Sequence, residues 1–84
     1  MLEDKLKKII EDKLGIEPTN YSNDSRFIED LGCDSLDVID LIMDIEKEFN
    51  ISIPDDDVNK LDTVGNLIEY VKERISVYPH RRKS

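Results

Sequence analysis

The apolar residues of this chain recur with the period of an α-helix in three separate segments, and this spacing constrains the fold more than any other feature. In residues 2–14 they stand about three and four positions apart, and Gly15 suits the left-handed conformation that often follows a helix. The second segment begins at Ser35, because Asp34 can accept hydrogen bonds from the free N–H groups of the first turn. Its buried stripe is expected to comprise Ile39, Ile42, Ile45 and Phe49, widened by Val38 and Leu41.

The third helical segment follows Thr63, its expected N-cap, and keeps apolar residues on one side as far as Ile75. We expect this helix to end near residue 76, before Pro79, which disfavours the helical conformation in the residue ahead of it. Residues 78–84 are basic and are expected to form a disordered tail. The sequence therefore predicts one domain over residues 1–77.

The connections between these helices are expected to be packed loops. Ile51 and Ile53 alternate like a strand, but no second strand-like run exists to pair with them, so we interpret them as apolar anchors in a loop. A short helix near residues 56–61, capped by Asp55, is expected to follow. The connection over residues 15–34 is long for so small a domain and carries three apolar anchors, Phe27, Ile28 and Leu31. The chain is thus expected to be all-α, with a long structured loop between its first two helices.

The length and the cysteine content limit the kind of protein. A chain of 84 residues allows one small domain, and the lone Cys33 excludes an intrachain disulfide, which fits a reducing compartment. Met1 leads directly into a charged amphipathic pattern, and no uncharged run approaches the roughly 20 residues that span a bilayer. We expect a monomer in the cytoplasm or an equivalent organelle lumen, without stable insertion into a membrane.

The negative charge of the chain is concentrated in one segment. The formal net charge is -8, and residues 34–57 contain nine acidic residues and one basic residue, whereas acids and bases balance in the remainder. Such a field repels the phosphates of nucleic acids and attracts basic protein surfaces. We therefore expect protein partners with basic patches and no nucleic acid.

Ser35 lies where this acidic segment begins, at the expected start of a helix. No histidine or lysine stands near it in the sequence to activate its hydroxyl, and His80, the sole histidine, is in the expected tail. The G-x-S-x-G arrangement of a serine hydrolase is also absent. A catalytic serine is therefore not expected, and the chain is predicted not to be an enzyme. A hydroxyl in this setting is better suited to being modified.

Residues 27–37 have the sequence FIEDLGCDSLD, which resembles the attachment motif of the acyl carrier protein family. Further matches at the spacings of that family are EKEF at 46–49, IPD at 53–55 and TV at 63–64. The resemblance covers nearly the whole chain, from Leu2 to about Ile75. Cys33 is a departure, since the family commonly has alanine there, and we interpret it as a small, partly buried side chain.

The resemblance implies a small four-helix bundle whose third helix is short. It also implies a 4′-phosphopantetheine arm, taken from coenzyme A by a phosphopantetheinyl transferase and joined through a phosphodiester to Ser35. The thiol of the arm would hold growing acyl chains as thioesters and present them to the enzymes of fatty acid synthesis. The alternatives are a specialised carrier of the same fold for polyketide, lipid A or aminoacyl chemistry, or an acidic protein-binding module that is never modified.

The predicted docking surface lies on the second helix, next to Ser35. There, exposed apolar side chains among carboxylates would offer a small contact ringed by steering charge. Its residues are expected to be Asp34, Leu36, Asp37, Asp40, Met43 and Glu46. No metal site is expected, because Lys60 and Asn66 occupy the glycine and glutamate positions that a calcium loop starting at Asp55 would need.

Overall fold

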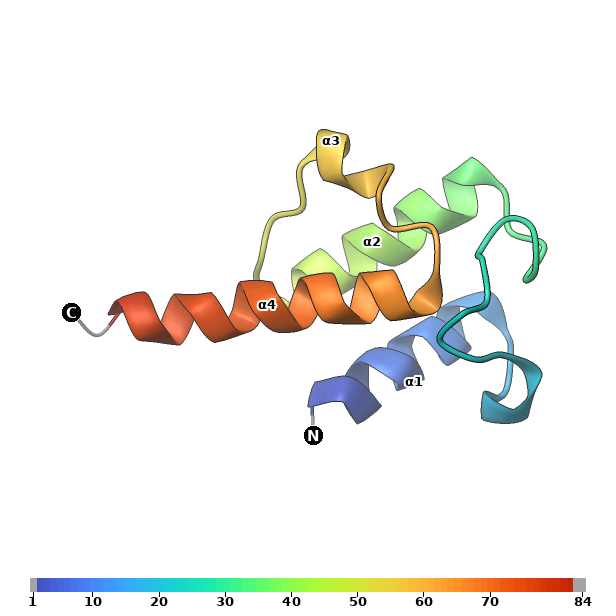
Figure 1. Cartoon of the computed structure of the whole chain (residues 1–84), viewed down its shortest axis with the longest axis horizontal. Helices are drawn as coiled ribbons and strands as arrows, with labels where there is room; N and C mark the ends of the chain where they lie inside the picture. Colours follow the sequence, from blue (N-terminus) through green and yellow to red (C-terminus); the bar gives the residue numbers. More distant parts are fainter. Residues whose placement is uncertain (1, 83–84) are drawn as a thin grey trace.

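The computed structural model describes residues 2–82, and over this range it contains four α-helices and no strand longer than an isolated bridge (Figure 1). The elements in chain order are α1 (Leu2–Leu14), the 3-10 helix η1 (Pro18–Asn20), α2 (Ser35–Phe49), α3 (Asp55–Val58) and α4 (Val64–Arg82). The all-α bundle with a short third helix is confirmed. No helix in the described residues is long and apolar enough to cross a membrane.

The core forms where α1, α2 and α4 bring their apolar faces together. Each fully buried aliphatic side chain contributes roughly 1.5–3 kcal/mol by leaving water. The side chains with essentially no exposure are Phe27, Leu6, Ile10, Leu41, Ile45, Leu67, Val64 and Val71. The expected loop anchors Ile51 and Ile53 are also buried, at 8% and 6% exposure.

The long loop between α1 and α2 is fastened to the start of α4. The Ser25 carbonyl accepts a hydrogen bond from the Val64 N–H at 3.1 Å, and the Asn23 carbonyl accepts one from Gly65 at 2.8 Å. Two free N–H groups of the first turn of α4 are thereby satisfied by the loop. Phe27 is buried in the core, and its N–H donates to the Asp62 carbonyl at 3.0 Å. The prediction of a structured loop is confirmed.

Two apolar residues expected in the core are exposed instead. Ile39 is 43% exposed, because the buried face of α2 is the stripe of Val38, Leu41, Ile42 and Ile45. These positions follow the i, i+3, i+4, i+7 pattern, and Ile39 stands one residue, or about 100° of helical rotation, away from its start. Ile28, expected to anchor the loop, is 54% exposed, since its neighbour Phe27 occupies the core position.

The helix ends also differ in two places. The short helix begins at Asp55 with Pro54 as its N-cap, one residue before the expected start, so Asp55 is its first residue rather than its cap. The expected end of the last helix near residue 76 is wrong, because α4 continues through Pro79 to Arg82. Proline removes one backbone hydrogen bond, but its fixed φ near −65° is itself helical. Of the expected tail, residues 83–84 lie outside the described residues.

Candidate functional site at the start of α2

Ser35 is the first residue of α2 and is exposed. Gly32, at a φ of 74°, turns the chain out of the loop in a conformation that favours glycine, and Asp34 then serves as the N-cap. The Asp34 carboxylate accepts a hydrogen bond from the Asp37 N–H at 3.0 Å, and the Asp37 carboxylate accepts one from the Asp34 N–H at 3.3 Å. This reciprocal capping fixes the first turn, in which Ser35 remains exposed.

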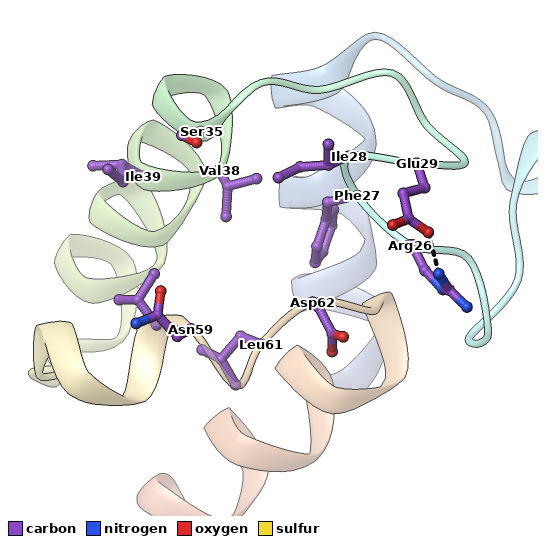
Figure 2. A pocket seen from close by; sticks show the side chains of 11 residues that line it. Arg26, Phe27, Ile28, Glu29, Ser35, Val38, Ile39, Asn59, Leu61 and Asp62 are labelled. Carbon is purple, nitrogen blue, oxygen red and sulfur yellow. Dashed lines mark hydrogen bonds and ion pairs between the residues drawn. The ribbon is translucent and has the colours of Figure 1, made fainter.

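The cavity next to Ser35 offers the hydroxyl no free basic group within residues 2–82. Over this range Arg26 is the one basic residue in the cavity lining, and its guanidinium is paired with the Glu29 carboxylate (Figure 2). A hydroxyl without a neighbouring base is a weak nucleophile. The arrangement therefore suits a serine that accepts a group from another protein.

Cys33, two residues before Ser35, is buried at 7% exposure. Burial raises the pKa of its thiol above the ordinary value, and the negative charges of Asp37 and Asp34 raise it further. The thiol is therefore protonated at neutral pH. The side chain is more deeply buried than the partly buried position expected from the sequence.

A cavity of about 330 Å³ opens beside Ser35, between α2, α3 and the end of the long loop (Figure 2). Val38 and Ile39 of α2 form one side of it, and α3 and the residues after it form the other. Most of its lining is hydrocarbon, contributed by Phe27, Ile28, Val38, Ile39, Val58 and Leu61. A hydrophobic chain attached near Ser35 would find an apolar space within reach.

An exposed apolar stripe runs along α2 from Ser35. Leu36, Ile39 and Met43 stand at i, i+3 and i+7, and they are 70%, 43% and 50% exposed. Exposure of Leu36 and Met43 was predicted, whereas Ile39 was missed. No local signal separates Ile39 from Val38, because adjacent residues of α2 can both be buried, as Leu41 and Ile42 are.

The carboxylates of α2 fall into two groups. Asp44 is paired with Lys13 at 3.1 Å and Glu48 with Lys5 at 2.9 Å, so lysines of α1 neutralise this end of the helix. Glu46, a predicted docking residue, is half-buried, and its Oε2 accepts a hydrogen bond from the Ile53 N–H at 2.7 Å. This bond gives Glu46 a role in holding the loop before α3.

The other predicted docking residues lie near Ser35. Asp34 and Asp37 are exposed at the cap, and Asp40 is exposed one turn further along α2. Leu36 and Met43 lie on the exposed apolar stripe. In the described part of the chain, no group of three or more histidine, cysteine, aspartate or glutamate side chains is placed to hold a metal ion.

Comparison with known proteins identifies the family. Residues 4–71 match the family model described as phosphopantetheine attachment site. The chain is 47% identical over 72 residues to an acyl carrier protein of Clostridium acetobutylicum, covering 86% of this chain and 94% of that protein. It is 41% identical over 71 residues to an acyl carrier protein of Thermotoga maritima, covering 84% of this chain and 88% of that protein. The chain therefore belongs to the acyl carrier protein family, whose members are carriers rather than enzymes and bear a covalently bound 4′-phosphopantetheine group.

Proposed function

We propose that Ser35 carries the phosphopantetheine arm and that the protein presents growing acyl chains to the enzymes of fatty acid synthesis. The observation that supports this most strongly is the exposed Ser35 hydroxyl at the start of α2, inside the matched attachment region and beside an apolar cavity. The carrier domain in this proposal comprises residues 1–77, acts as a monomer and works in the cytoplasm or an equivalent organelle lumen.

The residues around Ser35 fit a phosphodiester. The first turn of a helix offers N–H groups and the positive end of the aligned peptide dipoles, both of which favour an added phosphate. Asp34 and Asp37 offset part of that field, so accessibility contributes more than electrostatic attraction. A phosphopantetheinyl transferase would supply the catalytic groups, while this chain supplies the acceptor oxygen and holds it on a rigid helix.

The arm supplies a thiol at which an acyl group is held as a thioester. The chain contributes a shelter for that acyl group, because the cavity beside Ser35 is lined mainly by hydrocarbon, including Phe27, Val38 and Leu61. Exclusion of water from this space would slow hydrolysis of the thioester. One side of the cavity is formed by α3 and the residues after it, so the position of that short helix sets the width of the space.

Docking in this proposal uses the surface next to Ser35. Leu36 and Met43 supply apolar contact, and Ile39 belongs with them because it lies between them on the exposed stripe. Asp34, Asp37 and Asp40 steer basic patches of the transferase and the synthesis enzymes toward that contact. Glu46 contributes less to docking than Asp40, since its carboxylate is already bonded to Ile53.

The proposal is tested by loading the protein and following its cargo. The chain is incubated with coenzyme A and a phosphopantetheinyl transferase of broad specificity, and its intact mass is compared with that of Ser35→Ala. The loaded form is then given to purified fatty acid synthesis enzymes. Elongation on the wild-type chain, with no loading of the variant, is expected. A folded wild-type chain that never accepts the group would contradict the proposal and favour an unmodified binding module.

A further inference from the structure

The segment around α3 is anchored at its buried ends, and of residues 54–60 only Val58 packs against the core. α3 comprises only Asp55–Val58, and none of its residues is fully buried. So short a helix gains few backbone hydrogen bonds to hold itself together. Ile53 before it and Leu61 after it are buried, at 6% and 3% exposure. Residues 54–60 therefore depend on side-chain contacts for their position.

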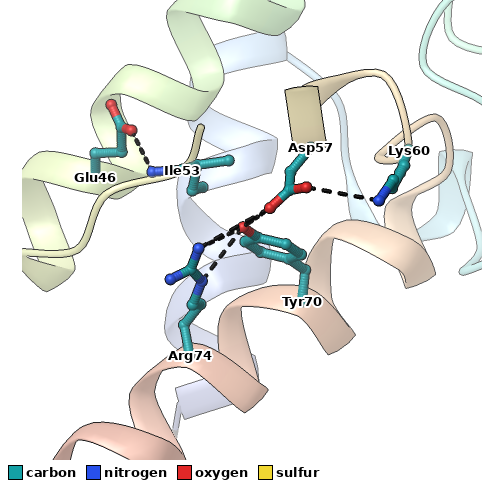
Figure 3. Close-up of polar contacts among 6 residues, drawn as sticks. All are labelled: Glu46, Ile53, Asp57, Lys60, Tyr70 and Arg74. Atoms are coloured by element: carbon teal, nitrogen blue, oxygen red, sulfur yellow. Dashed lines mark hydrogen bonds and ion pairs between the residues drawn. The ribbon is translucent and has the colours of Figure 1, made fainter. Parts of the chain in front are cut away.

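A polar cluster joins this segment to α4 (Figure 3). The Tyr70 hydroxyl donates a hydrogen bond to Asp57 Oδ2 at 2.5 Å, and Arg74 Nη2 donates to the same hydroxyl oxygen at 2.8 Å. The Arg74 guanidinium also lies over the Tyr70 ring, 5.1 Å from its centroid. The Asp57 side chain is 26% exposed, so water screens these contacts less than it would at an open surface. We call Asp57, Tyr70 and Arg74 the α3 latch.

Two cations near Asp57 strengthen the latch. Lys60 Nζ stands 3.7 Å from Asp57 Oδ1, and Arg74 Nη2 stands 3.9 Å from Oδ2. The Tyr70 hydrogen bond, above all, holds the pKa of the Asp57 carboxyl below its usual value, and both cations act in the same direction. Asp57 is therefore ionised at neutral pH and accepts a charge-assisted hydrogen bond, which is stronger than a neutral one.

The same segment forms one side of the cavity beside Ser35. Val58 and Leu61 both line that space. Figure 2 shows Leu61 on the side opposite Val38 of α2. Ile53, at the start of the segment, is fixed to α2 by its hydrogen bond to Glu46. A displacement of residues 54–60 between their buried ends would therefore widen the cavity without disturbing α1 or the buried face of α2.

We propose that the α3 latch controls the opening of the cavity beside Ser35. With the latch formed, α3 lies against the cavity and shelters what is inside. With the latch broken, residues 54–60 move outward and the cavity widens. Tyr70 is a positioning residue, because it acts on the cavity through α3. The identity of the group that enters the cavity rests on the proposed function, whereas the coupling of Tyr70 to α3 does not.

The first test measures amide hydrogen exchange in the unmodified full-length chain. Tyr70→Phe removes only the hydroxyl of the latch and keeps the ring. Tyr21→Phe is the matched control, because it removes a hydroxyl bonded to Glu11 at 2.7 Å on the α1 side of the molecule. We expect exchange at Val58 and Leu61 to become roughly fivefold faster in Tyr70→Phe, the effect of losing one typical hydrogen bond. Amide exchange in α1 and α2 should not change in Tyr70→Phe, and Tyr21→Phe should not change amide exchange in α3.

A uniform rise in exchange over all helices would mean that Tyr70 serves general stability, and unchanged exchange in α3 would mean that the latch does not hold it. Either result overturns the proposal, whether or not Ser35 carries an arm.

The second test loads both variants with an octanoyl group and measures its cleavage by hydroxylamine. We expect the octanoyl thioester to be cleaved faster in Tyr70→Phe than in Tyr21→Phe. An acetyl thioester should be cleaved equally fast in both variants. Equal octanoyl cleavage would overturn control of the cavity, while failure to load would count against the proposed function instead.

Discussion

Asp34 and Asp37 cap the start of α2 reciprocally, since each carboxylate accepts a hydrogen bond from the backbone N–H of the other residue, at 3.0 and 3.3 Å. Ser35 stands between these two residues in the sequence, so the two hydrogen bonds fix its backbone. The same two carboxylates also belong to the acidic surface that faces partners. This pair of residues thus positions Ser35 and also contributes negative charge to the surface beside it.

Removal of this cap should destabilise the protein measurably. Asp34→Ala leaves the Asp37 N–H without its side-chain acceptor, and loss of an N-cap costs about 1 kcal/mol in the free energy of unfolding. Urea denaturation followed by circular dichroism measures this change. Asp34→Ser retains an oxygen that can cap the helix and should recover most of the loss. Equal stability of Asp34→Ala and the wild-type chain would show that the cap contributes nothing.

Gly65 should not tolerate a side chain, although it lies in a helix. A Cβ at this position would stand 3.0 Å from the Asn23 carbonyl oxygen, which is itself held by a hydrogen bond from the Gly65 N–H. Alanine normally gains roughly 0.5–1 kcal/mol over glycine in a helix, but overpacking costs about 1–3 kcal/mol. We expect Gly65→Ala to lose about 1 kcal/mol of unfolding free energy in urea. A gain in stability would mean that the loop can move away from α4 at no cost.

The contribution of Asp57 to stability should depend on pH. Its carboxyl has a lowered pKa in the folded chain, so its stabilising effect is fully present above the ordinary aspartate pKa of about 3.9 and is lost as the pH falls through the folded value. At pH 7 the wild-type chain should therefore unfold at a higher urea concentration than Asp57→Asn. The gap between the two midpoints should close below about pH 4. A gap that is constant from pH 7 to pH 3 would contradict this account of Asp57.

Docking should be sensitive to charge at Asp40 and not to charge in general. Asp40→Lys places a cation in the middle of the exposed stripe, and we expect the kcat/KM of loading by the transferase to fall about tenfold at low salt. Glu73→Lys is the matched control, because it makes the same charge change at an exposed position on α4. The difference should shrink as the salt concentration rises. Equal losses in both variants, or a loss that does not depend on salt, would rule out local steering.

The fold could be predicted from the sequence where one short signal decides the structure. Asp34 before Ser35 and Thr63 before Val64 mark helix starts through side-chain oxygens, and both act as predicted, the Thr63 Oγ1 accepting from the Asn66 N–H at 3.1 Å. Gly15 likewise takes the positive φ, 69°, that its place after α1 required. Each of these signals depends on residues within one turn.

The rest depends on contacts between distant segments, which no local pattern contains. Ile39 and Val38 are equally apolar, and only the packing of other segments against α2 decides that Val38 is buried and Ile39 is exposed. Nothing near Glu46 indicates that its carboxylate bonds to Ile53, or near Tyr70 that its hydroxyl meets Asp57. Proline often ends a helix, so the sequence predicts an end near residue 76. The φ angle of proline is itself helical, however, and α4 continues through Pro79.

Attachment of the arm to Ser35 is tested most directly by locating the modification in the sequence. The chain loaded with coenzyme A and transferase is digested, and its peptides are sequenced by tandem mass spectrometry, with Ser22 and Ser25 of the long loop as internal controls. We expect one phosphopantetheine per chain, found on Ser35 and absent from Ser35→Ala. The modification of another serine, or equal modification of the Ser35→Ala variant, would contradict it.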